Sequence, residues 1–129
     1  MLDERCDPTL DALLDVYVPG ADARSGAALP IVVWTHGGAF IGGSKDQIGA
    51  HLQMIADHGF AVVGMRCRLA PEGRYPMPNR QVMAALGHLQ GHAARLHLDP
   101  TRIVLVGNSA GAQFRTVAGR RMVRRRRVR

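Results

Sequence analysis

The sequence predicts an α/β fold with a mostly parallel sheet and flanking helices. Two observations support this: short apolar runs alternate with longer amphipathic stretches along residues 13–113, and Gly and Pro separate them. The order strand, helix, strand, helix, strand is typical of helical crossovers between parallel strands. The chain has 129 residues, of which 47% are hydrophobic and 21% charged, so we expect one domain with one core.

Four runs are the predicted strands. Residues 14–18 alternate apolar and polar side chains, so this strand should have one buried face. Residues 31–34, 60–65 and 103–106 are apolar, as expected for strands covered on both faces of a parallel sheet. The small and polar stretch 20–30 is a predicted loop.

Two amphipathic stretches are the predicted helices. Residues 46–58 place apolar side chains at spacings of three and four, and a glycine ends the pattern. Residues 82–96 repeat this pattern and should end near Asp99-Pro100, because the residue before a proline avoids helical backbone. The segment 66–78 between the strand and this helix contains three prolines and is a predicted long loop.

The net charge of +7 is unevenly distributed along the chain. Residues 1–113 hold nine basic and ten acidic residues, a net charge of −1, whereas residues 114–129 hold eight arginines and no acid, a net charge of +8. The basicity therefore says nothing about the partners of the rest of the chain. We expect a domain portion over 1–113 and an Arg-rich tail over 114–129.

Localisation follows from hydropathy and cysteine content. No apolar run approaches the roughly 18 residues that span a bilayer, and the first residues are acidic where a signal peptide would be basic. The two cysteines, Cys6 and Cys67, lack metal-type spacing and are interpreted as free thiols. A cytoplasmic protein without a membrane span is expected.

One pentapeptide matches the GxSxG pattern of a serine nucleophile. It consists of Gly107, Asn108, Ser109, Ala110 and Gly111, and it directly follows the last predicted strand. In a strand-turn-helix setting the tight turn exposes the serine hydroxyl, and glycine allows the close backbone approach that such a turn requires. A plain loop rich in Gly and Ser has the same composition, so the pentapeptide alone leaves both interpretations open.

A second glycine-rich segment favours the catalytic interpretation. His36, Gly37, Gly38 and Ala39 follow the strand predicted in the first half of the chain. Uncovered backbone N–H groups at such a position form an oxyanion hole worth about 3–4 kcal/mol per donor. The amide of Ala110, at a helix start, would add a donor. A phosphate-binding loop is the alternative, but the spacing matches neither GxGxxG nor the P-loop pattern.

Three further blocks accompany these two segments in the same order along residues 12–113. They are Gly42-Gly43-Ser44-Lys45, Arg68-Leu69-Ala70-Pro71-Glu72 with Tyr75-Pro76, and Asp99-Pro100 with Arg102-Ile103. Taken together, the blocks resemble the α/β-hydrolase fold esterases and lipases of the hormone-sensitive-lipase and BD-FAE-like kind. The resemblance implies an incomplete α/β-hydrolase fold, the N-terminal half, truncated after the nucleophile turn.

The resemblance also implies a carboxylic ester hydrolase that uses neither a metal nor an organic cofactor. Ser109 would attack the ester carbonyl to give an acyl-enzyme that water then hydrolyses. Backbone amides of Gly38, Ala39 and Ala110 would bind the oxyanion. Residues in supporting roles would fix and shape these loops: His36, Gly37, Glu72, Gly107 and Gly111.

The general base of this mechanism is missing downstream of the nucleophile. In this fold the acid and the histidine follow the serine along the chain, yet residues 110–129 contain no His, Asp or Glu. A serine hydroxyl without a positioned base is a weak nucleophile. We therefore expect the 129-residue chain to be inactive or nearly so.

The upstream histidines are interpreted as solvated surface. His88 and His92 stand four apart on one helix face, close enough to share a metal or to serve as a base. Their helix should run along the flank of the sheet, away from the nucleophile, so neither role is expected. The same interpretation covers His51, His58 and His97.

Two hypotheses explain the Arg-rich tail. A change of reading frame near codon 114 would account for the arginines and for the missing acid and histidine together. Alternatively, a genuine polybasic arm would make the chain a non-catalytic protein that binds nucleic acid or an acidic membrane. No aromatic residues interleave the arginines for base stacking, so the first is favoured. The expected partner is a small-molecule ester, with no specific nucleic acid; the sequence leaves the oligomeric state open.

Overall fold

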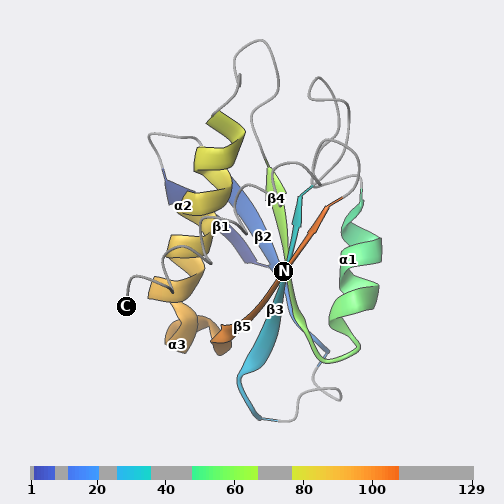
Figure 1. The fold of residues 1–129 in the computed structure, drawn as a ribbon. Coiled ribbons are helices and arrows are strands. Elements are labelled where there is room, and N and C mark those ends of the chain that lie inside the picture. The colour runs from blue at the N-terminus through green and yellow to red at the C-terminus, as the bar shows by residue number, and fades with distance from the viewer. Residues whose placement is uncertain (1, 8–11, 21–25, 36–47, 67–76, 108–129) are drawn as a thin grey trace.

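The computed structural model describes residues 2–7, 12–20, 26–35, 48–66 and 77–107. They form a five-stranded sheet with helices on both faces (Figure 1). The strand order is β1 (Leu2–Asp7), β2 (Ala12–Tyr17), β4 (Ala61–Arg66), β3 (Leu29–Thr35) and β5 (Leu98–Gly107). β4, β3 and β5 run parallel, and β2 is antiparallel to both β4 and β1. Among the described strands β2 alone is reversed, which confirms the predicted α/β class with a mostly parallel sheet.

The central strand of the parallel part is β3 (Leu29–Thr35). It pairs with β4 (Ala61–Arg66) on one side and with β5 (Leu98–Gly107) on the other. All three strands contain predicted apolar runs, with ends that differ by one or more residues. β3 packs on both faces because its β-branched residues point alternately to the two helical layers.

β5 begins earlier than the sequence pattern predicts. The helical region ends at Leu96, three residues before Asp99, which agrees with the predicted end near Asp99-Pro100, but both of these residues already lie within the strand. Within the described sheet β5 pairs with β3 alone, and its register shifts opposite the segment between Leu29 and Ile31. Pro100 is compatible with this strand, because β5 is an edge strand of the described sheet and its pairing is irregular there. At such a position the proline nitrogen does not need to donate a hydrogen bond to a neighbouring strand.

The N-terminal part differs from the prediction in two ways. β1 (Leu2–Asp7) is not indicated by the sequence, because its run LDERCD lacks a clear apolar alternation. Its place at the outer edge of the described sheet accommodates such a charged run. β2 (Ala12–Tyr17) was expected to have one buried face, but Tyr17 and Asp15 are buried as well as Leu14. Helices cover both faces of the sheet, so the one-face prediction is wrong.

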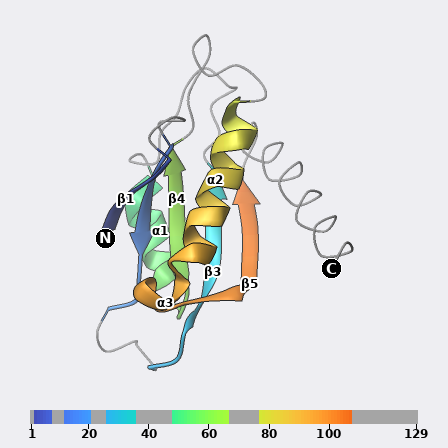
Figure 2. The same cartoon turned by 90° about the vertical axis from the view of Figure 1, so that its left-hand side faces the viewer.

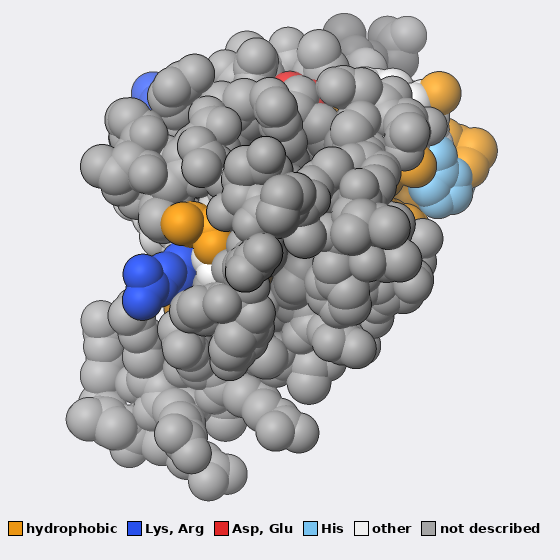
Figure 3. All heavy atoms as spheres, turned by 90° about the horizontal axis from the view of Figure 1, so that it is seen from above, with side chains coloured by type: hydrophobic (Ala, Val, Ile, Leu, Met, Phe, Trp, Pro, Cys, Tyr) orange, Lys and Arg blue, Asp and Glu red, His pale blue; other side chains and the backbone are white. Residues whose placement is uncertain are grey.

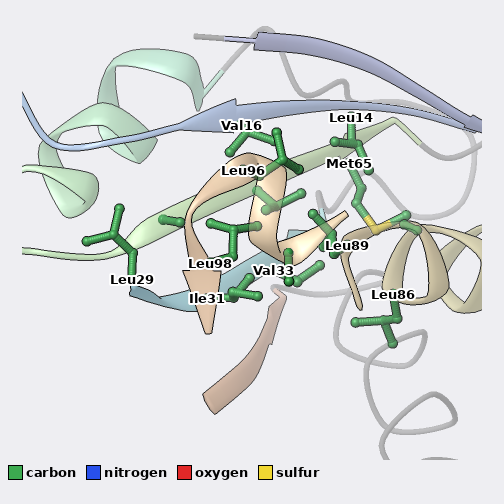
Figure 4. Packing of buried hydrophobic residues seen from close by; sticks show 14 of the residues in the cluster. Leu14, Val16, Leu29, Ile31, Val33, Met65, Leu86, Leu89, Leu96 and Leu98 are labelled. Atoms are coloured by element: carbon green, nitrogen blue, oxygen red, sulfur yellow. The ribbon is translucent and has the colours of Figure 1, made fainter. Parts of the chain in front are cut away.

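One hydrophobic core lies between the sheet and the helices α2 (Met77–Gly91) and α3 (Ala93–Leu96). Figure 4 shows side chains from β2, β3, β4 and β5 meeting those of the two helices. Full burial of one such aliphatic side chain stabilises the fold by about 1.5–3 kcal/mol. The largest residues of this core are Leu14, Val16, Leu29, Ile31, Val33, Val63, Met65, Val82, Leu86, Leu89, Leu96 and Leu98.

A second, smaller core lies under α1 (Gly49–Ala56) on the opposite face. Its fully or nearly fully buried members are Tyr17, Leu52, Ala56 and Val62. The helix is shorter than the predicted 46–58, of which residues 46 and 47 lie outside the described residues. After the helix, Gly59 adopts φ +96°, a backbone conformation that favours glycine and lets the chain turn into β4.

The second predicted helix is in fact two helices, α2 (Met77–Gly91) and α3 (Ala93–Leu96). Figure 2 shows both lying along one face of the sheet. α2 begins five residues before the predicted start at Val82, because Pro78 fits the first turn, where no intrahelical N–H bond is needed. α3 ends at Leu96 and is capped by His97, which has a left-handed backbone with φ 59°. No helix in the described segments is long and apolar enough to cross a bilayer.

Candidate active site

The carboxyl ends of β3, β4 and β5 lie side by side at one edge of the sheet. In the strand register Thr35 pairs with Met65 of β4 on one side and with Gly107 of β5 on the other. Open α/β sheets bind ligands outside the carboxyl ends of their strands. This edge, toward which the three strands point in Figure 1, is therefore the candidate site.

The end of β3 is tied to β5 by a side-chain hydrogen bond. The hydroxyl of Thr35, which is buried, donates to the backbone carbonyl of Val106 at 3.3 Å. This bond fixes the two strand ends relative to each other at the point where the chain leaves them. Sequence analysis did not single out Thr35; the available signal was a hydroxyl residue that ends an otherwise apolar strand.

Among the predicted site residues, Gly107 lies within the described residues. It is the last residue of β5, so the prediction that the GxSxG segment directly follows a strand is confirmed. The other predicted site residues lie outside the described residues, and their roles stay predictions: His36, Gly37, Gly38, Ala39, Glu72, Ser109, Ala110 and Gly111. The described strands nevertheless fix where both segments begin: the diglycine segment follows Thr35 directly, and the GxSxG segment begins at Gly107.

Polar side chains near this edge also come from the start of α2, which Figure 1 places on the side where β4 ends. Asn79 and Gln81 are both buried in its first turns. Among the described residues, the Asn79 side-chain oxygen has no hydrogen-bond partner. Figure 3 shows the surface of the molecule from this edge. Described hydrophobic side chains and a histidine are visible on the side of α1, and Lys or Arg side chains are visible on the side of α2.

The described histidines lie away from the strand ends or on the surface. His88 is in the last turn of α2, which starts at the carboxyl edge and runs along the sheet toward the opposite edge, as the sequence predicts for this helix. His92 is exposed, whereas His88 is half-buried beside it. His51 is exposed and meets the ring of Trp34 edge-on, with centroids 5.6 Å apart. No group of three potential metal ligands occurs in the described part of the chain.

Comparison with known proteins identifies the family. A family model described as BD-FAE matches residues 14–125 of the chain. The chain belongs to the BD-FAE family. This match extends from β2 past β5 and includes part of the Arg-rich segment, so the predicted boundary at residue 113 stays a prediction. The solved structures that are similar to this chain, described below, are esterases with the α/β-hydrolase fold.

The BD-FAE chain is similar to curated esterases over most of its length. It is 32% identical over 114 residues to the ethyl acetate hydrolase of Pseudomonas putida, covering 86% of this chain and 35% of that protein. It is 30% identical over 108 residues to an acetyl esterase of Salmonella schwarzengrund, covering 83% and 32% respectively. The chain thus spans about a third of the length of these relatives.

Solved structures confirm the fold of the BD-FAE chain. The hyperthermophilic esterase of the archaeon Pyrobaculum calidifontis superposes with a TM-score of 0.78 at 32% identity, covering 89% of this chain and 36% of that one. A bacterial heroin esterase superposes with a TM-score of 0.74 at 33% identity, covering 80% and 32%. The predicted α/β-hydrolase fold and esterase family are therefore confirmed.

Proposed function

We propose that the chain contributes the nucleophile and the oxyanion-binding amides of a serine hydrolase that acts on carboxylic esters. Membership of the BD-FAE family supports this proposal. The observation that argues for it most directly is the register between Thr35 and Gly107. Because these residues are partners on adjacent parallel strands, the diglycine segment and the GxSxG segment begin next to each other at the edge of the sheet where ligands bind.

The proposed chemistry is acyl transfer through a covalent intermediate. The Ser109 oxygen attacks the ester carbonyl carbon, the carbonyl oxygen becomes an oxyanion, and the alcohol leaves as the tetrahedral intermediate collapses to an acyl-enzyme. Backbone N–H groups of Gly38, Ala39 and Ala110 would donate to the oxyanion, each worth about 3–4 kcal/mol in the transition state. Water then releases the acid and regenerates the serine.

We further propose that the 129-residue chain by itself hydrolyses esters slowly or not at all. The attack needs a base to accept the hydroxyl proton, and no His, Asp or Glu follows Ser109 in the sequence. We do not expect His88 or His92 to accept that proton, because His88 lies in the last turn of α2 and His92 follows the end of that helix, away from the carboxyl ends of the strands. Supporting backbone amides without a base retain only a small part of the rate enhancement.

The substrate that the relatives favour is an ester with a short acyl group. The similar proteins include an ethyl acetate hydrolase and an acetyl esterase, both named for two-carbon acyl groups. We therefore propose a small, uncharged ester as the substrate class.

A chimeric enzyme tests the proposed function. Residues 1–113 are joined to the part of the Pseudomonas putida ethyl acetate hydrolase that follows its matching segment, and hydrolysis of p-nitrophenyl acetate is measured. We expect turnover that Ser109→Ala abolishes and that the control Ser25→Ala leaves unchanged. A folded chimera whose activity survives Ser109→Ala would refute the proposal. For the unfused chain we expect no turnover above that of Ser109→Ala, and a serine-dependent rate would contradict the proposed inactivity.

The Arg-rich segment supports a second candidate function, binding to polyanions. Eight arginines in residues 114–129 give a net charge of +8 that is concentrated in one short stretch. If this function is correct, residues 114–129 fused to a neutral carrier should be retained on heparin and released by salt, whereas residues 1–113 should not. Reading the nucleotide sequence after codon 113 in all three frames tests the rival explanation, because a frame that restores an acid and a histidine would favour it.

A further inference from the structure

The end of α2 presents two imidazole rings in contact with each other. His88 lies in the last turn of α2 and His92 at the junction with α3, one helical turn later. Their ring centroids are 4.2 Å apart, and the ring planes enclose an angle of 28°. Helical backbone continues across this turn, because the His92 N–H donates to the His88 carbonyl at 3.0 Å. The two side chains are therefore held on the same helix face.

The His92 ring is oriented by the backbone. Its Nδ1 lies 2.9 Å from the carbonyl oxygen of His88, and since a carbonyl oxygen only accepts, Nδ1 carries the proton of this bond. In the neutral ring the lone pair then resides on Nε2. A backbone carbonyl that accepts from the second ring nitrogen is the usual partner of a metal-ligating histidine, because it fixes the tautomer and the ring orientation.

We propose that His88 and His92 form a two-histidine chelating site for a divalent transition-metal ion, with Cu²⁺ bound more tightly than Ni²⁺ or Zn²⁺. Imidazole nitrogen suits these three ions, and Cu²⁺ stands highest among them in the order of divalent affinities. Histidine nitrogens ligate such ions at about 2.0–2.1 Å, so rings in contact reach one ion after rotation about their side-chain bonds. Water completes the coordination, since no third ligand accompanies the pair in the described segments.

The bound ion would act on the junction between α2 and α3. It would join the His88 side chain in α2 to the His92 side chain, which follows the end of that helix, and would thereby cross-link one helical turn. An ion that binds the folded chain and not the unfolded chain raises its stability. We therefore expect the thermal midpoint to rise on addition of Cu²⁺.

The chain offers a matched control in α1 and the turn that follows it. The His58 Nδ1 lies 2.9 Å from the carbonyl oxygen of Met54, four residues earlier, which is the same contact between ring and carbonyl as in His92. His58 is exposed, but the position one turn before it holds a methionine in place of a histidine. If the site needs two imidazole rings, substitution of His92 should lower the affinity for Cu²⁺, whereas substitution of His58 should leave that affinity unchanged.

Calorimetric titration of the purified, untagged chain with CuCl₂ tests the site. We expect one equivalent of Cu²⁺ to bind, with affinity reduced about tenfold or more by His88→Asn or by His92→Phe, since even outer-shell groups contribute 10- to 100-fold to metal affinity. His92→Phe keeps a ring for stacking but removes both nitrogens. His58→Phe should bind as the parent does. Equal weakening by His58→Phe and His92→Phe would overturn the proposal, as would parent binding no tighter than that of the doubly substituted chain.

A second measurement needs no variant and therefore does not depend on their folding. Substoichiometric Cu²⁺ broadens NMR signals close to the ion, and we expect the imidazole signals of His88 and His92 to broaden before those of His51, His58 and His97. Broadening that is uniform over all described histidines would show that no specific site exists.

Discussion

At the scale of single residues, Asp99 is the side chain whose surroundings most clearly change its chemistry. Its carboxylate accepts hydrogen bonds from the hydroxyl of Thr101 at 2.6 Å, from the Thr101 N–H at 2.9 Å and from Nε of Arg102 at 2.7 Å. The Thr101 hydroxyl and N–H, followed by Arg102, lower the pKa of Asp99 to about 2. Arg102 also donates to the carbonyl of Ala28, so this group joins the start of β5 to the start of β3.

The Asp99 cluster gives a prediction on acid stability. Because the folded-state pKa lies below the unfolded value of about 3.9, the contribution of this carboxylate is fully present above pH 4 and is lost as the pH falls through about 2. Asp99→Asn should therefore flatten the loss of stability between these pH values. Urea unfolding of parent and variant at several pH values measures the difference. Thr101→Val should flatten the same window in part; identical curves for all three proteins would contradict the assignment.

At the scale of elements, two glycines differ in their backbone conformation, so we expect a Gly→Ala substitution to change the stability in opposite directions at the two positions. Gly59 ends the turn after α1 with φ +96°, a conformation that costs other residues about 1–2 kcal/mol. Gly87 lies in the exposed part of α2, where a Cβ atom would meet nothing within 4 Å. A helix interior favours alanine over glycine by about 1 kcal/mol.

We expect Gly59→Ala to lower the free energy of unfolding by about 1 kcal/mol and Gly87→Ala to raise it by about the same amount. Chemical denaturation of the two variants beside the parent measures both changes. Since the chemical substitution is identical, the sign of the change reports the backbone conformation alone. The structure around α1 would be contradicted by a Gly59→Ala variant as stable as Gly87→Ala.

At the scale of the whole molecule, the described sheet has an edge at β5. Val104 is 58% exposed, although its register partner on β3, Val32, packs against the core under α1. The two residues lie on the same face of the sheet, so α1 covers β3 and leaves this part of β5 uncovered. An exposed apolar edge strand is a site for pairing with other chains.

We expect Val104→Lys to reduce self-association of the chain, because a lysine on an edge strand opposes edge-to-edge pairing. Its stability should change by no more than about 0.5 kcal/mol, as is usual for surface positions. Val33→Lys is the matched control on the neighbouring strand, where full burial of the side chain should prevent folding. Light scattering and thermal unfolding measure the two effects. A Val104→Lys variant that unfolds like Val33→Lys would show that this edge is covered.

The sequence by itself determined the α/β class and the three parallel strands, the last of which precedes Ser109. Runs of β-branched residues such as 31–33 are typical of the interior of a parallel sheet. Local patterns did not determine β1, the second buried face of β2 or the start of β5. A charged run forms β1 because β2 pairs with it, and Tyr17 is buried because α1 lies over it.

Tertiary structure also decided which strand ends meet. Thr35 and Gly107 are separated by 71 intervening positions of chain, and only the pairing of β3 with β5 makes them partners. Motifs name the residue types that the chemistry requires, such as the glycines and Ser109, but their spacing in the chain says nothing about distance in space. That distance follows from strand order, which depends on how the two helical layers bury the apolar faces of the sheet.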